Sequence, residues 1–141
     1  MTSIDRDALR QQLIHHEGLR LKAYRDSVGI LTIGIGRNLE DRGITEAEAR
    51  YLLDNDINAC INDLLTFAWF PDLDPVRQRV FVDLCFNLGV KRLREFTKML
   101  DAAEHKDWTK AAAELLDSKY AEQVGQRAQT LAAMLVTGRA S

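Results

Sequence analysis

The sequence predicts an α+β fold in which a small N-terminal lobe with a short β-sheet is joined by a long helix to an all-helical C-terminal lobe. Between residues 21 and 36, β-branched and aromatic residues are concentrated together with turn-forming residues, which is typical of a small antiparallel sheet or hairpin. Most of the remaining chain repeats apolar residues at helical spacing. Because two lobes joined by a helix leave a groove, we expect a cleft for an extended ligand between them.

We expect a single domain over residues 1–141, because this length suits one compact folding unit. Within this domain, the β-containing lobe is predicted at about residues 15–45, the connecting helix at about 45–66 and the helical lobe at about 67–141. An N-terminal helix over residues 5–16, which Gly18 ends, is expected to belong to the helical lobe.

Several helices are predicted from their starting residues. Thr45 with Glu48 forms a capping-box pattern that opens the connecting helix, and Asp74-Pro75 places an N-cap before a first-turn proline. A shorter helix is expected at about 95–103, another begins after Asp107, and the last covers about 126–136.

Composition and charge exclude several classes of protein. The formal net charge of -2 argues against nucleic acid as a partner, since phosphate binding usually requires a basic excess. Cys60 and Cys85 lie in apolar helical patterns and are too few for a disulfide framework or a zinc site, so we expect buried free thiols. No metal or other cofactor is expected. Charges near the N-terminus argue against a signal peptide, and no apolar run reaches the roughly 18 residues of a membrane span.

Two carboxyl groups are predicted to lie in contrasting environments. Glu17 comes at the C-terminal end of the first predicted helix, where the partial negative charge favours a protonated carboxyl. The flanking Leu13 and Leu19 could add an apolar cover. Asp26 follows nine residues later in a turn-rich stretch and is expected to stay ionised. Such a pair can divide the roles of acid and base in glycoside cleavage.

Thr32 offers a hydroxyl six residues beyond Asp26 that could orient a water molecule for the base. Taken alone, each of these residues has a commoner structural role: Glu17 as a surface helix residue, Asp26 as a turn former and Thr32 as a strand former. Their spacing, which continues directly into Thr-Ile-Gly-Ile-Gly, is a rare combination and favours the catalytic interpretation.

The segment from His16 to Asp26, followed by residues 32–36, closely resembles the T-even phage lysozyme family, glycoside hydrolase family 24. The likeness continues along nearly the whole chain, at Gly43–Ala49, Phe86–Gly89, Phe96-Thr97, Trp108, Arg127-Ala128 and Thr137-Gly138.

This resemblance implies a phage-lysozyme-like fold and a muramidase that lyses the host cell. Such an enzyme hydrolyses the β-1,4 bond between N-acetylmuramic acid and N-acetylglucosamine in peptidoglycan, with inversion. Carried over by motif, Glu17 is the general acid, while Asp26 and Thr32 activate or position the attacking water. Inverting enzymes hold their carboxyl groups about 6.5–9.5 Å apart to leave room for that water.

The resemblance also implies substrate contacts. Arg127 matches the family arginine that approaches the acid, and Phe86 with Asn87 matches a sugar-binding stretch. Some positions depart from the best-known member, which has a histidine at the place of Arg37 and an apolar cleft residue at the place of Asn38. Met99 and Glu114 stand where that member presents polar, uncharged sugar contacts.

Two other functions, a lytic transglycosylase and a non-catalytic binding module, fit the pattern less well. A lytic transglycosylase cuts the same bond with a substrate hydroxyl and needs the acid, but it does not need Asp26 and Thr32 to position water. A non-catalytic peptidoglycan-binding module would need none of the three residues. We therefore expect a monomeric endolysin that acts on peptidoglycan glycan strands, without nucleic acid or stable membrane insertion. It is expected to accumulate in the host cytoplasm and to reach the periplasm through a separate holin.

Overall fold

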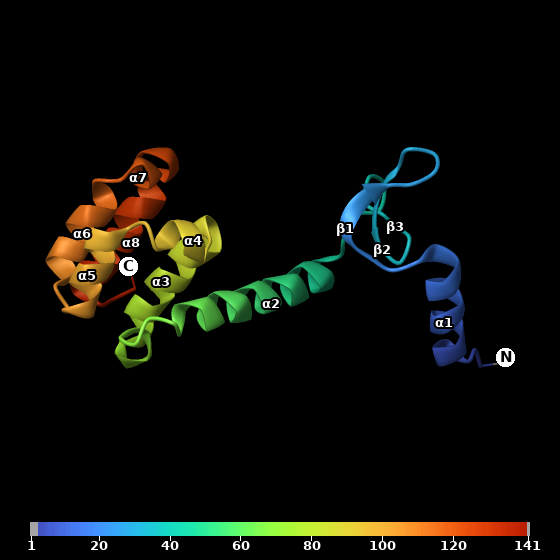
Figure 1. Ribbon diagram of the computed structural model, residues 1–141, viewed down its shortest axis with the longest axis horizontal. Helices are drawn as coiled ribbons and strands as arrows, with labels where there is room; N and C mark the ends of the chain where they lie inside the picture. The colour runs from blue at the N-terminus through green and yellow to red at the C-terminus, as the bar shows by residue number, and fades with distance from the viewer. Residues whose placement is uncertain (1–2, 141) are drawn as a thin grey trace. The chain divides into compact units, whose positions relative to one another are not determined.

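The computed structural model describes residues 3–140. Its contacts divide the chain into two compact units, Met1–Tyr51 and Leu52–Ser141, which we call the N-terminal unit and the C-terminal unit. The described residues form a three-stranded antiparallel sheet and eight α-helices, which confirms the predicted α+β fold (Figure 1). The boundary between the units falls inside helix α2 (Glu46–Leu64).

The N-terminal unit begins with helix α1 (Arg6–Glu17). The side chain of Asp5 caps its start by accepting a hydrogen bond from the Ala8 amide at 3.1 Å. Gly18 ends the helix with a φ of 78°, and its amide donates to the Ile14 carbonyl at 2.8 Å. The predicted stop at Gly18 is therefore confirmed, and it makes Glu17 the last residue of the helix.

The sheet of this unit consists of β1 (Arg20–Arg25), β2 (Leu31–Gly34) and β3 (Arg37–Asn38), in that order. Tyr24 on β1 and Asn38 on β3 both pair with Thr32, which places Thr32 in the central strand. The sequence predicted a sheet that ends near Gly36. This boundary was wrong, because strand β3 follows at Arg37–Asn38. Gly34 and Gly36 have φ values of 72° and 67°, so they turn the chain back into a third strand instead of ending the sheet.

Helix α2 begins at the predicted capping box. The Thr45 amide donates to Glu48 Oε1 at 2.9 Å, and the Glu48 amide donates to Thr45 Oγ1 at 3.1 Å. These reciprocal bonds satisfy two amides that the first turn of a helix leaves free. The start of the connecting helix is therefore fixed by local chemistry that the sequence alone reveals.

The C-terminal unit is helical throughout its described part. After α2 come the short 3-10 helix η1 (Phe70–Asp72), α3 (Pro75–Leu88), α4 (Val90–Leu93), α5 (Thr97–Glu104), α6 (Trp108–Leu116), α7 (Lys119–Val124) and α8 (Gln126–Thr137). Asp74 caps α3 and Asp107 caps α6, as predicted. Helices α4 and α7 were not predicted, because segments of 4 and 6 residues are too short to show a full apolar period.

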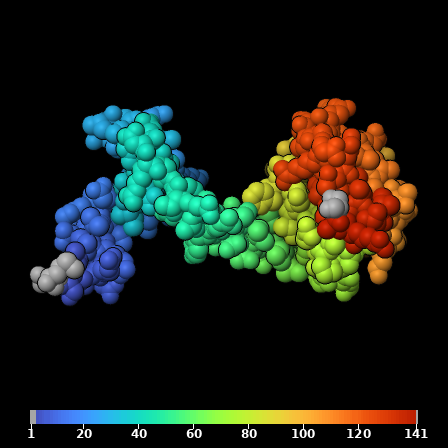
Figure 2. Space-filling view, turned by 180° about the vertical axis from the view of Figure 1, so that it is seen from behind, coloured from blue at the N-terminus to red at the C-terminus, as the bar shows by residue number. Residues whose placement is uncertain are grey.

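The hydrophobic core lies in the C-terminal unit. Helix α6 packs against both α5 and α8, and α3 packs against α8; residues of α8 also form much of the face of this unit seen in Figure 2. Phe81, Leu84 and Leu115 have fully buried side chains within this cluster. Cys60 and Cys85 belong to the same core as free thiols, which confirms that prediction. Over residues 3–140, none of the helices is long and apolar enough to cross a membrane.

Candidate active site

The Glu17 carboxyl group lies against the turn between β2 and β3 within the N-terminal unit. A Cβ atom added to Gly36 would lie 2.5 Å from Glu17 Oε2 and 2.9 Å from its Cδ. These distances are shorter than van der Waals contact, so the carboxyl group occupies space that any other residue at position 36 would fill. The close approach and the positive φ of Gly36 together explain why glycine stands there.

Asp26 forms the turn that joins β1 to β2. Its Oδ1 accepts hydrogen bonds from the Val28 amide at 3.0 Å and the Ile30 amide at 2.9 Å. The Asp26 amide donates to the Ile30 carbonyl at 2.9 Å, and its carbonyl accepts from Gly29 at 3.0 Å. Asp26 is thus a turn former, and the same bonds fix one oxygen of its half-buried carboxylate. Within residues 3–140, no hydrogen bond is found to Oδ2.

Thr32 is the one buried polar residue among those the structure describes, with 4% of its surface exposed. Its hydroxyl donates to the Ile30 carbonyl at 2.8 Å. The hydroxyl proton is therefore committed to the backbone, and Oγ1 can act only as an acceptor toward a further group.

The peptide groups of Ile30 connect Asp26 to Thr32. The Ile30 amide holds the Asp26 carboxylate, and the Ile30 carbonyl receives the Thr32 hydroxyl. The sequence did not predict the link through Ile30 or the close approach of Glu17 to Gly36, because Ile30 and Gly36 both act through their backbone atoms. The sole sequence signal for the Gly36 contact was the pair of glycines at 34 and 36. The N-terminal unit thus places Asp26 and Thr32 on one hairpin, and Glu17, the last residue of α1, lies against the turn that follows β2.

The expected apolar cover over Glu17 is not present in the described part of the N-terminal unit. Leu13 and Leu19 are 43% and 59% exposed, and Glu17 itself is exposed. The prediction that these two leucines desolvate the carboxyl group was wrong. The reason is that Leu13 lies a full turn before the end of α1, while Leu19 stands in the link to β1.

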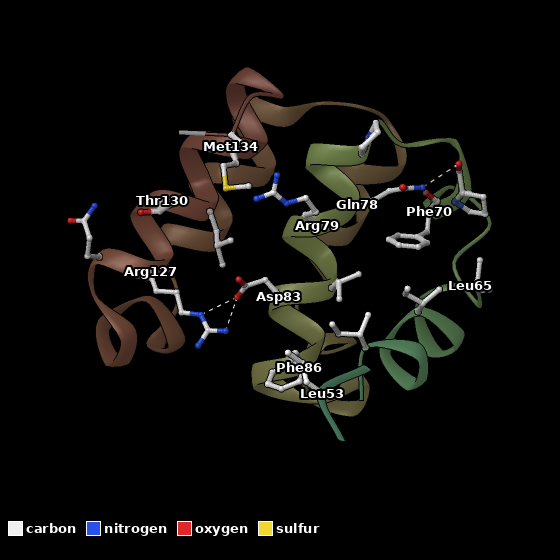
Figure 3. A pocket seen from close by; sticks show the side chains of 18 residues that line it. Leu53, Leu65, Phe70, Gln78, Arg79, Asp83, Phe86, Arg127, Thr130 and Met134 are labelled. Carbon is white, nitrogen blue, oxygen red and sulfur yellow. Dashed lines mark hydrogen bonds and ion pairs between the residues drawn. The ribbon is translucent and has the colours of Figure 1, made fainter. Parts of the chain in front are cut away.

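Phe86 and Arg127 line one groove of about 1140 Å³ in the C-terminal unit (Figure 3). Arg127 donates to Asp83 Oδ1 from Nε at 2.9 Å and from Nη2 at 2.7 Å, and these bonds raise the pKa of the guanidinium group. Phe86 is 46% exposed. Much of the lining is apolar, from residues such as Ile57, Val82, Leu131 and Met134.

The third predicted contact, Asn87, and the departures Met99 and Glu114 lie elsewhere in this unit. Asn87 is exposed and does not line that groove among the described residues. Met99 and Glu114 line a second pocket of about 460 Å³, together with Lys98 and Tyr120. Burial raises the pKa of the Tyr120 phenol. Two of the four departures from the family pattern, Met99 and Glu114, therefore meet at one place.

One group of side chains in the described chain could hold a metal ion. Asp101, Glu104 and His105 offer ligand atoms within 4.8 Å of one another at the end of α5. All three are exposed, and His105 Nδ1 already lies 2.8 Å from the Asp101 carbonyl oxygen. These residues belong to the C-terminal unit and are not part of the hairpin that carries Asp26 and Thr32. His15 and His16 are exposed on α1.

Comparisons with known proteins connect this arrangement to one family. A sequence profile of the family described as phage lysozyme matches residues 14–137. Probable T4-type lysozyme 1 of Dictyostelium discoideum is 24% identical over 161 aligned residues, which cover 93% of this chain and 95% of that protein. The SAR-endolysin of Escherichia phage Mu is 32% identical over 68% of this chain and 58% of that protein.

The pre-baseplate central spike protein Gp5 of Enterobacteria phage T4 is 27% identical over 93% of this chain, but the match covers 28% of that protein. The profile match includes Glu17, Asp26 and Thr32 as well as the region of Phe86 and Arg127. The family match and the names of the relatives support a lysozyme-like function.

Proposed function

This chain belongs to the phage lysozyme family, and we propose that it is a muramidase that hydrolyses the β-1,4 bond between N-acetylmuramic acid and N-acetylglucosamine in peptidoglycan, with inversion. The observation that carries the proposal is the linkage of Asp26 and Thr32 through Ile30, on the hairpin whose next turn contacts Glu17. Inverting hydrolysis requires a carboxylic acid and a second carboxylate that activates a water molecule, and the Thr32 hydroxyl can help to hold that water.

Glu17 acts as the general acid in this proposal. Its carboxyl group transfers a proton to the glycosidic oxygen as the bond to the anomeric carbon breaks, so the leaving sugar departs as a neutral alcohol. The close contact with Gly36 restricts the positions that the carboxyl group can take. Proton transfer needs this restriction, because the donor and acceptor atoms must come within hydrogen-bond distance.

Asp26 and Thr32 hold the attacking water. The Thr32 hydroxyl proton is hydrogen-bonded to the Ile30 carbonyl, so Oγ1 accepts a hydrogen bond from the water. Asp26 Oδ1 is occupied by two amides, which leaves Oδ2 to accept the other hydrogen and then to take the proton during attack. The oxygen lone pair of the water is then free for the anomeric carbon, which is attacked on the face opposite the leaving group.

Phe86, Asn87 and Arg127 are proposed as contacts for the glycan strand. Phe86 presents an exposed aromatic side chain and Asn87 an exposed amide on α3. Arg127 keeps three guanidinium N–H groups that it does not use toward Asp83. Sugars offer hydroxyl groups to such donors and apolar faces to aromatic side chains.

Substitutions at three positions test the chemistry on purified peptidoglycan. Glu17→Gln and Asp26→Asn should each lower turnover by about 10²- to 10⁴-fold, as is typical for general acid and base groups. Thr32→Val should lower turnover while Thr32→Ser preserves it, because serine keeps the hydroxyl. Asp7→Asn, at a carboxylate 94% exposed on α1, is the matched control and should retain activity. Near wild-type turnover of Glu17→Gln would overturn the proposal.

Product analysis separates the proposed reaction from the alternatives. Mass spectrometry should find reducing muramic acid ends, whereas anhydro-muramic ends would identify a lytic transglycosylase. Nuclear magnetic resonance should find the α anomer first, and a β product would contradict inversion. Peptidoglycan binding without any cleavage would identify a non-catalytic module.

We further propose that the protein acts as a monomeric endolysin whose passage from the host cytoplasm to the peptidoglycan depends on a separate holin. Expression in a Gram-negative host tests this proposal. Lysis should require co-expression of a holin and should be absent with Glu17→Gln. Lysis by this chain expressed alone would overturn the proposed dependence on a holin.

A further inference from the structure

Arg37 makes a three-point contact that directly follows the Gly36 turn. Its guanidinium group donates to Glu48 Oε1 from Nη1 at 2.9 Å and to Glu48 Oε2 from Nη2 at 2.5 Å. Nη1 also donates to the Gly43 carbonyl at 3.2 Å. The Arg37 side chain is 24% exposed. A bidentate, half-buried pair of this kind fixes direction as well as distance.

Glu48 is itself anchored on the first turn of α2. Its Oε1 accepts from the Thr45 amide at 2.9 Å while it also receives the Arg37 guanidinium. The hydrogen bonds from Arg37 and then from Thr45 lower the pKa of Glu48 from 4.5 to about 2. The carboxylate is therefore ionised throughout the neutral and mildly acidic range, and it ties β3 to a capped helix end.

The backbone that this pair holds is the surface against which the Glu17 carboxyl lies. Gly36 precedes Arg37 directly, and the Glu17 Oε2 atom lies 2.5 Å from the place of a Gly36 Cβ. Ile33 pairs with Arg37 across the hairpin, so Arg37 is also in register with β2, the strand that carries Thr32. A shift of Arg37 would therefore move the backbone that the Glu17 carboxyl contacts.

We propose that Arg37 and Glu48 are positioning residues for the proposed general acid: their ion pair holds the Gly36 turn in the place that aims the Glu17 carboxyl at the substrate. This inference rests on the proposed function. It also gives a reason for Arg37, one of the departures from the family pattern. Neither residue touches the reacting atoms in this proposal, and the pair acts through the backbone.

Two conservative substitutions break the pair: Glu48→Gln leaves the Arg37 bond to the Gly43 carbonyl in place, whereas Arg37→Lys also removes the Nη1 atom that makes it. Glu48→Gln keeps the capping box, which accepts Glu or Gln at this position, but removes the charge. Arg37→Lys keeps the charge but loses the two-pronged geometry. Each should lower kcat about tenfold on soluble peptidoglycan strands with KM within about twofold, since small displacements of a catalytic group mainly affect the chemical step. The double variant should equal Arg37→Lys, because Glu48→Gln removes only the interaction that Arg37→Lys has already broken.

Two controls separate positioning from stability. Thr45→Ala removes the hydroxyl that caps α2 but keeps the Thr45 amide bond and both Arg37 bonds to Glu48. It should lower the melting temperature without lowering kcat. Glu46→Gln breaks the exposed Arg50–Glu46 pair on the same helix, whose side chains are 73% and 82% exposed, and should change neither quantity.

The outcomes distinguish this inference from the proposed function. Wild-type kcat in both Arg37→Lys and Glu48→Gln, with Glu17→Gln inactive, would overturn the positioning role and leave the muramidase assignment standing. The positioning role would also be overturned if Arg37→Lys and Glu48→Gln lowered kcat no more than Thr45→Ala does. Additive losses of kcat in the double variant would overturn it as well. A wild-type protein that does not cleave peptidoglycan would overturn both. Should Arg37→Lys not fold, Glu48→Gln decides alone.

Discussion

The N-terminal and C-terminal units are stabilised by different interactions. Every buried hydrophobic residue of the described chain lies between Cys60 and Leu135, in the C-terminal unit. Over residues 3–51, Thr32 is the single buried residue. The N-terminal unit is instead held by the sheet ladder, the Asp26 turn, the Glu48 cap and the ion pair to Arg37.

This difference separates two physical tasks. Burial of apolar side chains supplies most folding free energy and is non-directional, whereas hydrogen bonds contribute less net stability but fix directions. The C-terminal unit therefore has the larger source of stability. The N-terminal unit has the directional contacts that orient Asp26 and Thr32, and Glu17 lies close to its Gly36 turn. We expect the two units to respond differently to the same kind of substitution.

The largest expected effect is on the core of the C-terminal unit. Phe81 is fully buried and meets Trp69 edge-on at 5.0 Å, so Phe81→Ala should lower the free energy of unfolding by about 3–5 kcal/mol. Both tryptophans, Trp69 and Trp108, belong to this unit, and urea unfolding followed by their fluorescence measures the loss. Leu21→Ala, at a residue 83% exposed on β1, should change it by less than about 0.5 kcal/mol. A large effect of the Leu21 variant would contradict the comparison.

A smaller effect is expected from Gly36→Ala, and it should appear in activity instead of fluorescence. The added Cβ would displace the Glu17 carboxyl, and kcat should fall roughly 10²-fold, about 2.7 kcal/mol in barrier height. Gly43→Ala is the matched control, because Gly43 has a similar φ of 59° but its Cβ would meet its nearest atom at 4.0 Å. Equal activity of the two variants would refute the contact argument.

A third effect tests directional contacts within the C-terminal unit. Asp74 caps α3 by accepting from the Arg77 amide at 3.1 Å, so Asp74→Ala should lower the free energy of unfolding by about 1 kcal/mol. Asp74→Asn keeps an acceptor and should retain most of that stability. A loss from Asp74→Ala as large as that from Phe81→Ala would mean that caps outweigh burial in this unit.

The smallest effect concerns pH. The pKa of Glu48 is about 2 in the folded chain and 4.5 ordinarily. The folded pKa is the lower one, so its stabilising contribution is present above about pH 4.5 and is lost as the pH falls toward 2. Amide exchange in the first turn of α2 should accelerate over that range in the wild type. Glu48→Gln, which does not titrate, should lack this acceleration.

Local chemistry explains which parts of the fold the sequence could predict. The starts of α2, α3 and α6 were predicted because their caps involve residues three apart, such as Thr45 with Glu48. Helices α4 and α7 were missed because they are short. Their places depend on packing, as for Leu93 and Tyr120, which are both buried.

The candidate site likewise has a part that the sequence could predict and a part that it could not. The hairpin with Asp26 and Thr32 was predictable from turn and strand formers. The Arg37–Glu48 pair joins residues 11 apart in sequence, and the contact of Glu17 with Gly36 spans an even longer separation. Residue types alone do not specify such pairings, because their partners are chosen by the path of the chain between them.

The two core thiols have a practical consequence for labelling. Cys60 and Cys85 are 9% and 2% exposed. Burial is the main reason that the pKa of the Cys85 thiol is raised to about 12, and the neighbouring Cys60 raises it further. Maleimides and nitroxide reagents react with accessible thiolates, so both native cysteines should stay unmodified in the folded protein. A single cysteine introduced on the surface of either unit would then carry a fluorophore or spin label without prior removal of the native ones.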